Sequence, residues 1–142
     1  MVVGSHRKTA KKPSPKRKLL ADGSVPEKFI QKDILDWLKD TGMLHWRQNS
    51  GTVFMGNRCI KLGEDGLPDI VVVVPPGGRL LGLEVKSAHG SLRPKQKEFQ
   101  SKLNDVGGAY FVVRSLKQAQ EALATTMGEE QWKRQQSSTP AN

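Results

Sequence analysis

The chain has 142 residues, of which 23 are Lys or Arg and 14 are Asp or Glu, so its formal net charge is +9. This length suits one domain with short tails, and a hydrophobic content of 36% can supply a globular core. The single cysteine, Cys59, excludes an intrachain disulfide framework and a cysteine-rich zinc module. No apolar run is long enough to span a bilayer.

Much of the positive charge lies in the first 19 residues, which carry no acidic side chain. Their seven basic residues are Arg7, Lys8, Lys11, Lys12, Lys16, Arg17 and Lys18, and the 16 basic and 14 acidic residues that remain nearly cancel. We predict that residues 1–22 form a disordered basic arm that attracts DNA, with Lys12 and Arg17 as contacts. The alternative is a solubilising tail, in part an expression-tag remnant at Gly4-Ser5-His6.

The first helix is predicted over Ser24 to Thr41, because apolar residues recur there at spacings of three and four. Ser24 is a suitable N-cap, and Gly42 is expected to end the helix. The segment from Met43 to Gly51 is predicted to be a connection, with Trp46 packed in the core.

From Thr52 onward, strand patterns dominate, and the prediction is an α/β fold. Strands are expected at 52–55 and 58–62 around a Gly56-Asn57 turn, and at 70–74, 80–86 and 109–113. Helices are expected at 94–106 and 116–124, and a polar tail over 127–142. The resulting order, α-β-β-β-β-α-β-α, indicates a mixed β-sheet flanked by helices, within a domain spanning residues 23–126.

A hairpin register brings two acids together. If 70–74 and 80–86 pair about the turn at Pro76 and Gly77, the numbers of paired residues sum to about 153. Asp69 and Glu84 then lie opposite each other, with Lys86 on the same face as Glu84. Opposed carboxylates repel unless one is protonated, a lysine neutralises them or a divalent cation bridges them. The residues alone leave open a Mg²⁺ site and a structural ion pair to Lys86.

Pro68-Asp69 followed by Glu84-Val85-Lys86 resembles the PD-(D/E)xK motif of restriction-endonuclease-like nucleases. From Glu27 to Ser115 the chain is similar to the virus-type replication-repair (VRR) nuclease domains. Further matching segments are Trp46-Arg47-Gln48-Asn49-Ser50-Gly51, Pro94-Lys95-Gln96 and Gly108-Ala109-Tyr110. The resemblance implies a restriction-endonuclease-like fold and a Mg²⁺-dependent endonuclease, with Mn²⁺ as a substitute. The substrate implied is branched DNA, a four-way junction or a flap.

The same resemblance implies that Glu27, Asp69, Glu84 and the peptide oxygen of Val85 hold the metal. Lys86 would position the attacking water or stabilise the transition state. Since one site cuts one strand, resolving a Holliday junction requires two sites, and we expect a symmetric homodimer. Many such domains are stand-alone phage proteins, which points to a bacterial or phage-infected cytoplasm.

Three further residues have two readings each. Glu27 completes an S-x-x-E capping box with Ser24, so it serves either the helix terminus or the metal shell. Gln96 lies on the apolar stripe of its helix, where a buried amide would need partners on the active-site strand, or else at the solvated edge of that stripe. Arg47 either reaches DNA or caps the first helix, and Lys95 is an outward position that can touch phosphate.

Other function classes find little support. The histidine spacing does not suit zinc, no phosphate-binding loop for a nucleotide occurs, and Leu19-Leu20-Ala21 is too short for a secretory signal. We therefore expect an intracellular protein without a nucleotide cofactor or a membrane partner. The competing hypotheses are a DNA-binding module that lacks catalysis and a flap or restriction-type nuclease.

Overall fold

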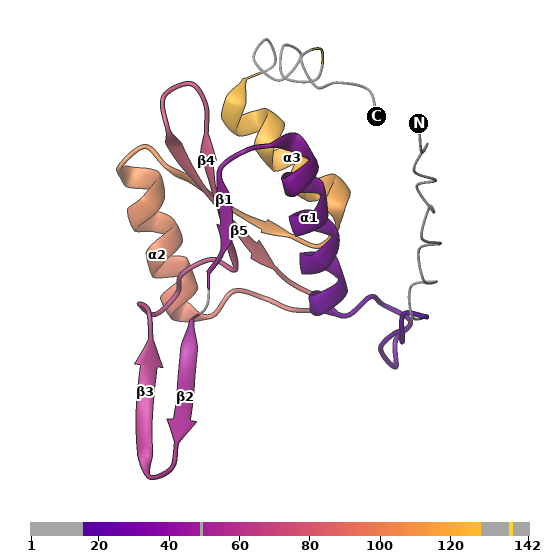
Figure 1. Cartoon of the computed structure of the whole chain (residues 1–142), viewed down its shortest axis with the longest axis vertical. Coiled ribbons are helices and arrows are strands. Elements are labelled where there is room, and N and C mark those ends of the chain that lie inside the picture. The colour runs from indigo at the N-terminus through magenta and orange to yellow at the C-terminus, as the bar shows by residue number, and fades with distance from the viewer. Residues whose placement is uncertain (1–15, 49, 129–136, 138–142) are drawn as a thin grey trace, which may run out of the picture.

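The structure, a computed structural model, describes residues 16–48, 50–128 and 137. Its helices are α1 (Glu27–Thr41), α2 (Pro94–Asp105) and α3 (Leu116–Met127). Its strands are β1 (His45–Arg47), β2 (Gly51–Met55), β3 (Arg58–Leu62), β4 (Ile70–Val74), β5 (Arg79–Val85) and β6 (Ala109–Val113). The predicted class is confirmed: a mixed sheet is flanked by helices (Figure 1).

The main sheet has the strand order β1-β4-β5-β6. β1, β4 and β5 are antiparallel neighbours, whereas β6 runs parallel to β5. The connection between these two parallel strands contains α2, as a parallel crossover requires. β2 and β3 form a separate two-stranded sheet, which projects from the rest of the molecule in Figure 1.

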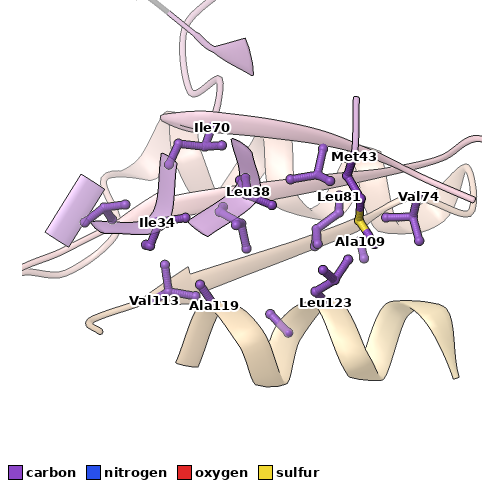
Figure 2. Packing of buried hydrophobic residues seen from close by; sticks show 14 of the residues in the cluster. Ile34, Leu38, Met43, Ile70, Val74, Leu81, Ala109, Val113, Ala119 and Leu123 are labelled. Carbon is purple, nitrogen blue, oxygen red and sulfur yellow. The ribbon is translucent and has the colours of Figure 1, made fainter. Parts of the chain in front are cut away.

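The hydrophobic core lies between one face of the main sheet and the helices α1 and α3 (Figure 2). Alternate residues of β4 and β5 point into it, among them Val72 and Leu83, and both are fully buried. Ile34 and Leu38 enter from α1 and Leu123 from α3. The odd-numbered side chains of β5 therefore pack in the core, and its even-numbered side chains, including that of Glu84, lie on the other face of the sheet.

α3 is longer than the sequence predicted. It continues past Ala124 to Met127, and the side chains of Thr126 and Met127 are buried. The Thr126 hydroxyl donates to the Ala122 carbonyl, and Met127 packs in the core. The polar residues around Thr125 gave no sign of this last turn in the sequence. Its helical conformation depends on the packing of Met127 in the core.

Three predictions near α1 and β1 are wrong. The helix begins at Glu27 rather than Ser24, because the backbone N–H and hydroxyl of Ser24 both donate to Asp22 Oδ1. The predicted connection after α1 contains β1, a three-residue edge strand held by its pairing with β4. Trp46 lies on this strand with 42% of its surface exposed and is not a core residue. A three-residue edge strand has too few residues to show a sequence period.

The hairpin of β2 and β3 agrees with the predicted turn, since Met55 pairs with Arg58 across Gly56-Asn57. All ten residues of its two strands are exposed. None of the helices in the described part of the chain is long and apolar enough to cross a membrane.

Candidate active site

The predicted register of β4 and β5 is confirmed. Ile70 pairs with Leu83 and Val74 with Arg79, so the numbers of paired residues sum to 153. Asp69 and Glu84 lie one position beyond the last pair, at the same end of the two strands. Asp69 Oδ2 accepts the backbone N–H of Val85 at 2.7 Å, which fixes this carboxylate against β5.

Glu84 is almost fully buried, with 3% of its surface exposed. One carboxylate oxygen, Oε1, lies 3.0 Å from Lys86 Nζ and accepts Gln96 Nε2 at 2.6 Å. The other oxygen, Oε2, is buried without a hydrogen-bond partner. Because a buried charged oxygen rarely lacks a donor or cation, this open oxygen marks a place where a positively charged ligand fits.

Lys86, one residue beyond the end of β5, is itself buried, and the alternation had predicted only that it shares a face with Glu84. Its backbone N–H donates to the Val113 carbonyl on β6 at 3.1 Å. The N–H of the preceding residue, Val85, points to the opposite edge, toward Asp69. In an extended strand a residue's N–H and C=O face the same edge, so the Val85 carbonyl also faces the Asp69 side.

The pKa values of the two carboxyls are perturbed in the same direction. Burial raises the pKa of Glu84, and the nearby charge of Asp69 raises it further, against the lowering effect of Lys86. Burial likewise raises the pKa of Asp69, opposed by its hydrogen bond from Val85 and by the charge of Lys86. The site thus holds two acids that are costly to ionise without additional positive charge.

Glu27 does not cap α1. Its Oε1 accepts the backbone N–H of Ser87 at 3.1 Å, which ties the first turn of α1 to the end of β5. Its charge contributes to raising the pKa of Asp69. Across residues 16–48 and 50–128, however, no three His, Cys, Asp or Glu side chains converge closely enough for a metal cluster. Direct coordination by Glu27 therefore stays a prediction.

The donors at the site suit a hard divalent cation. The open Glu84 oxygen, the Asp69 carboxylate and the Val85 carbonyl are all oxygen donors, the type that Mg²⁺ takes, usually together with water. The residues present fit such an ion with these three as first candidates. Glu27 is not among these three, because its carboxylate accepts the backbone N–H of Ser87.

The side-chain amide of Gln96 contacts the active-site strand β5, as its position on the apolar stripe of the helix predicted. Its Nε2 donates to Glu84, and its Oε1 accepts the Arg93 backbone N–H at 2.8 Å. The loop before β4 packs tightly on this helix start, because a Cβ added at Gly66 would lie 2.2 Å from the Lys95 carbonyl oxygen. The absence of a side chain at Gly66 lets the loop carrying Asp69 approach the helix carrying Gln96.

Sequence reasoning missed Tyr110 as a site residue. It lies on β6 opposite Gly82, and a Cβ at Gly82 would come within 3.3 Å of its ring. Its hydroxyl is buried near the Glu84 carboxylate without a well-aligned hydrogen bond, and burial, followed by the charges of Glu84 and Asp69 and the contact with Glu84, raises its pKa. A glycine paired with an aromatic residue, here Gly82 with Tyr110, could have indicated this site residue. Recognising the pair requires the parallel register of β5 and β6, which the sequence did not provide.

The predicted DNA contacts have different surroundings. Arg47 is exposed at the end of β1, close enough for its charge to lower the pKa of Asp69. Lys95 is exposed, with Nζ 3.5 Å from Glu98. Arg17 forms a bidentate ion pair with Asp33 on α1, so its contact with DNA stays a prediction. Lys12 lies outside the described residues, as does Asn49 of the Trp46–Gly51 segment.

Comparisons with known proteins identify the domain family of the chain. The sequence profile of the VRR-NUC domain matches residues 25–117, more than half of the chain. A solved structure described as a VRR_NUC domain is 27% identical in sequence, with a TM-score of 0.49, and the match covers 67% of this chain and 90% of that one. A search of curated proteins finds no match. From the profile match, together with the acids and the lysine it spans, the chain belongs to the VRR-NUC domain family.

Proposed function

We propose that this protein is a metal-dependent endonuclease that hydrolyses phosphodiester bonds in DNA, acting inside the cell. The open oxygen of Glu84, beside Asp69 and Lys86, is the observation that carries the proposal. The membership in a nuclease family supports it, and the approach of a buried acid, Glu84, to a half-buried one, Asp69, has no evident structural benefit.

The chain's own residues prepare the site for hydrolysis. Asp69, Glu84 and the Val85 carbonyl would hold Mg²⁺ or Mn²⁺, with Glu27 reaching the ion through water. The ion would supply positive charge that acidifies the attacking water and offsets charge developing on the phosphate. A water oxygen bonds to phosphorus while the bond to the leaving nucleotide oxygen breaks, without a covalent enzyme intermediate.

Lys86 and Gln96 serve that reaction differently. Lys86 Nζ has three N–H donors, and the ion pair with Glu84 occupies one direction, which leaves others for the attacking water or a phosphate oxygen. Gln96 donates to the same Glu84 oxygen and so holds the carboxylate rotamer with Oε2 left open. Lys86 is thus the proposed catalytic residue and Gln96 the positioning residue.

The surface around the site supports a DNA substrate. A cavity of about 480 Å³ borders the first turn of α2, and its lining includes the basic Arg93 and Lys95, together with the acidic Glu64 and Asp65. Arg47 lies on the edge strand β1, near enough for its charge to act on Asp69. These basic side chains would contact the DNA backbone and position the scissile phosphate.

Branched DNA is the proposed substrate class, with a four-way junction first and a flap second. Symmetric resolution of a junction needs two cuts, so two copies of the chain would act as a homodimer. The test is sedimentation of the protein combined with a junction-cutting assay. A strictly monomeric protein that makes paired symmetric nicks would contradict the dimer.

The nuclease proposal is tested on junction, flap and linear duplex DNA, each with Mg²⁺, with Mn²⁺ and with EDTA. We expect metal-dependent nicks that Glu84→Gln abolishes, with branched substrates cut faster than duplex. Glu98→Gln, an exposed acid on α2, is the control and should cut like the wild type. Binding without any metal-dependent cut would instead favour the DNA-binding module.

A further inference from the structure

The candidate active site contains a second buried polar group that lacks a well-made hydrogen bond, the hydroxyl of Tyr110. The residue is 3% exposed, and its hydroxyl oxygen is buried. Glu84 Oε2 is in the same condition, and no other buried side-chain oxygen or nitrogen in the described part of the chain is. A phenol O–H donates a hydrogen bond and a carboxylate oxygen accepts one, so the two atoms are chemically complementary.

The parallel pairing of β5 and β6 brings these two groups together. Tyr110 pairs with Gly82 and Val112 pairs with Glu84, so Tyr110 is the diagonal neighbour of Glu84 on one face of the sheet. Gly82 leaves room for the ring, since a Cβ there would lie 3.3 Å from it. The Glu84 carboxylate raises the pKa of the hydroxyl both through its charge and through direct contact, so the hydroxyl lies beside the acid.

The ring of Tyr110 is held between the sheet and α2. Its centroid lies 6.2 Å from that of Phe99, with the two planes tilted by 56°, an arrangement that aromatic pairs favour. The Tyr110 carbonyl accepts Gln100 Nε2 at 3.3 Å, which ties its backbone to the same helix. A phenylalanine would make the same apolar contacts, and burial of a hydroxyl is costly without a good hydrogen bond. Packing therefore accounts for the ring but not for the hydroxyl.

We propose that the Tyr110 hydroxyl donates a hydrogen bond to Glu84 Oε2 and orients this oxygen toward the metal ion. Tyr110 is then a second positioning residue, and the inference rests on the proposed metal-dependent function of the same site. Glu84 Oε1 already accepts Gln96 and pairs with Lys86, so Oε2 is the oxygen left for a further donor. Since a carboxylate oxygen has two lone pairs, Oε2 can accept Tyr110 and still bind a cation.

A neutral donor suits this oxygen better than a second charged one. Lys86 already places one positive charge beside Glu84, and another would compete with the ion for the same carboxylate. A phenol O–H fixes the direction of the oxygen and leaves the net charge of the acid available to the cation. Hydrogen-bond partners behind metal ligands contribute roughly 10–100-fold to metal affinity, so one hydroxyl can have a measurable effect.

The first test deletes the hydroxyl and keeps the ring. Calorimetry on the full chain without DNA should show that Tyr110→Phe binds Mn²⁺ about tenfold more weakly than the wild type. Thr126→Val is the matched control, because it deletes a buried hydroxyl from α3 in the core, and its Mn²⁺ affinity should be unchanged. Excess Mn²⁺ should restore the nicking rate of Tyr110→Phe, whereas a structural defect would persist at every metal concentration.

The second test measures the contact itself, without metal or activity. Tyr110 is the only tyrosine in the chain, so tyrosine labelled with ¹³C at Cζ gives one resonance in the NMR spectrum. Glu84→Gln should shift this resonance in the metal-free protein, because the acceptor changes from a carboxylate to an amide. Glu98→Gln, an exposed acid on α2, should leave it in place. Mg²⁺ added to the wild type should also shift it.

Two results would overturn the role of Tyr110: an unshifted resonance in Glu84→Gln, or wild-type Mn²⁺ affinity in Tyr110→Phe. In either case, metal-dependent nicking by the wild type would still uphold the nuclease proposal. A wild type whose Mn²⁺ affinity depends on the Tyr110 hydroxyl but which makes no nicks would contradict the nuclease proposal and uphold the positioning role. The two proposals can therefore fail separately.

Discussion

The ends of β4 and β5 and the hairpin of β2 and β3 are both antiparallel strand pairs, but their surroundings are opposite. Glu84 and Lys86 are polar and buried, whereas Val53 and Ile60 are apolar and exposed. In the first region a stable core sustains an arrangement of charges that is unfavourable by itself. In the second, apolar side chains lie outside the hydrophobic core and remain partly exposed. Each is a departure from the usual distribution of polar and apolar residues, and packing of the fold alone does not account for it.

The largest expected effect concerns the charges at the first region. Replacing Lys86 with Met keeps much of the side-chain volume and removes the ammonium group beside Glu84. We expect the nicking rate to fall by about 10²–10³-fold, the range seen when one charge-stabilising donor is removed from an active site. Single-turnover cleavage of a junction measures it, with Lys97→Met on the exposed side of α2 as the control. An unchanged rate would remove Lys86 from the proposed chemistry.

The second prediction compares the packing of the two regions directly. Leu81→Ala empties a fully buried position under α1 and α3 and should destabilise the protein by about 2–5 kcal/mol. Ile60→Ala, an aliphatic truncation on the hairpin, should cost less than about 1 kcal/mol in a monomeric sample. Urea unfolding measures both. Equal losses would show that the hairpin belongs to the same packed unit as the sheet.

The third prediction isolates the close approach of the Asp69 loop to α2. Gly66→Ala has two costs: a positive φ of 84° and a Cβ placed 2.2 Å from the Lys95 carbonyl oxygen. Gly107→Ala has only the first, since φ is 93° and nothing lies within 4 Å. We expect the control to lose about 1 kcal/mol and Gly66→Ala roughly 2–4 kcal/mol in thermal unfolding. Similar losses would mean that the contact with α2 is not tight.

The smallest expected effect is a pH dependence of stability in the metal-free protein. Burial raises the pKa of Asp69 above its unfolded value, so the folded state binds the proton more tightly. This contribution is present at low pH and is lost as the pH rises through the folded pKa. Asp69→Asn should therefore be more stable than the wild type at neutral pH in EDTA, with a smaller difference at acidic pH.

Thermal melts at both pH values measure the effect, with the exposed Asp40→Asn as the control. A gain for Asp69→Asn that is larger at acidic pH would contradict the assigned direction of the shift. Added Mg²⁺ should stabilise the wild type more than Asp69→Asn, because only the wild type keeps the full set of donors.

Several parts of the fold were accessible from the sequence because their signals are local. The run Ile70–Val74 matches β4, and the Gly56-Asn57 turn matches the hairpin. The register that brings Asp69 beside Glu84 follows from the turn and strand lengths alone. Gln96 was found because an amide on an apolar stripe needs a partner, which is Glu84.

Other features depend on contacts between distant segments. β1 exists because it pairs with β4, and Trp46 is exposed because β1 is an edge strand with no neighbour beyond it. Glu27 has the sequence of a capping residue, but the Ser87 amide, 60 positions away, occupies its carboxylate. Tyr110 enters the site only through the parallel pairing of β5 and β6.

The sequence by itself determined the class of fold, the registers of the two hairpins and the opposed acids Asp69 and Glu84, because periodicity and turn chemistry act over a few neighbouring residues. Only the tertiary structure decided which oxygen of Glu84 remains open, which side chains enclose it and which apolar side chains stay exposed. Those outcomes depend on how helices and strands that are far apart in the chain pack against each other. Whether an acid is buried or exposed is decided by this long-range packing, because the local sequence around it does not differ.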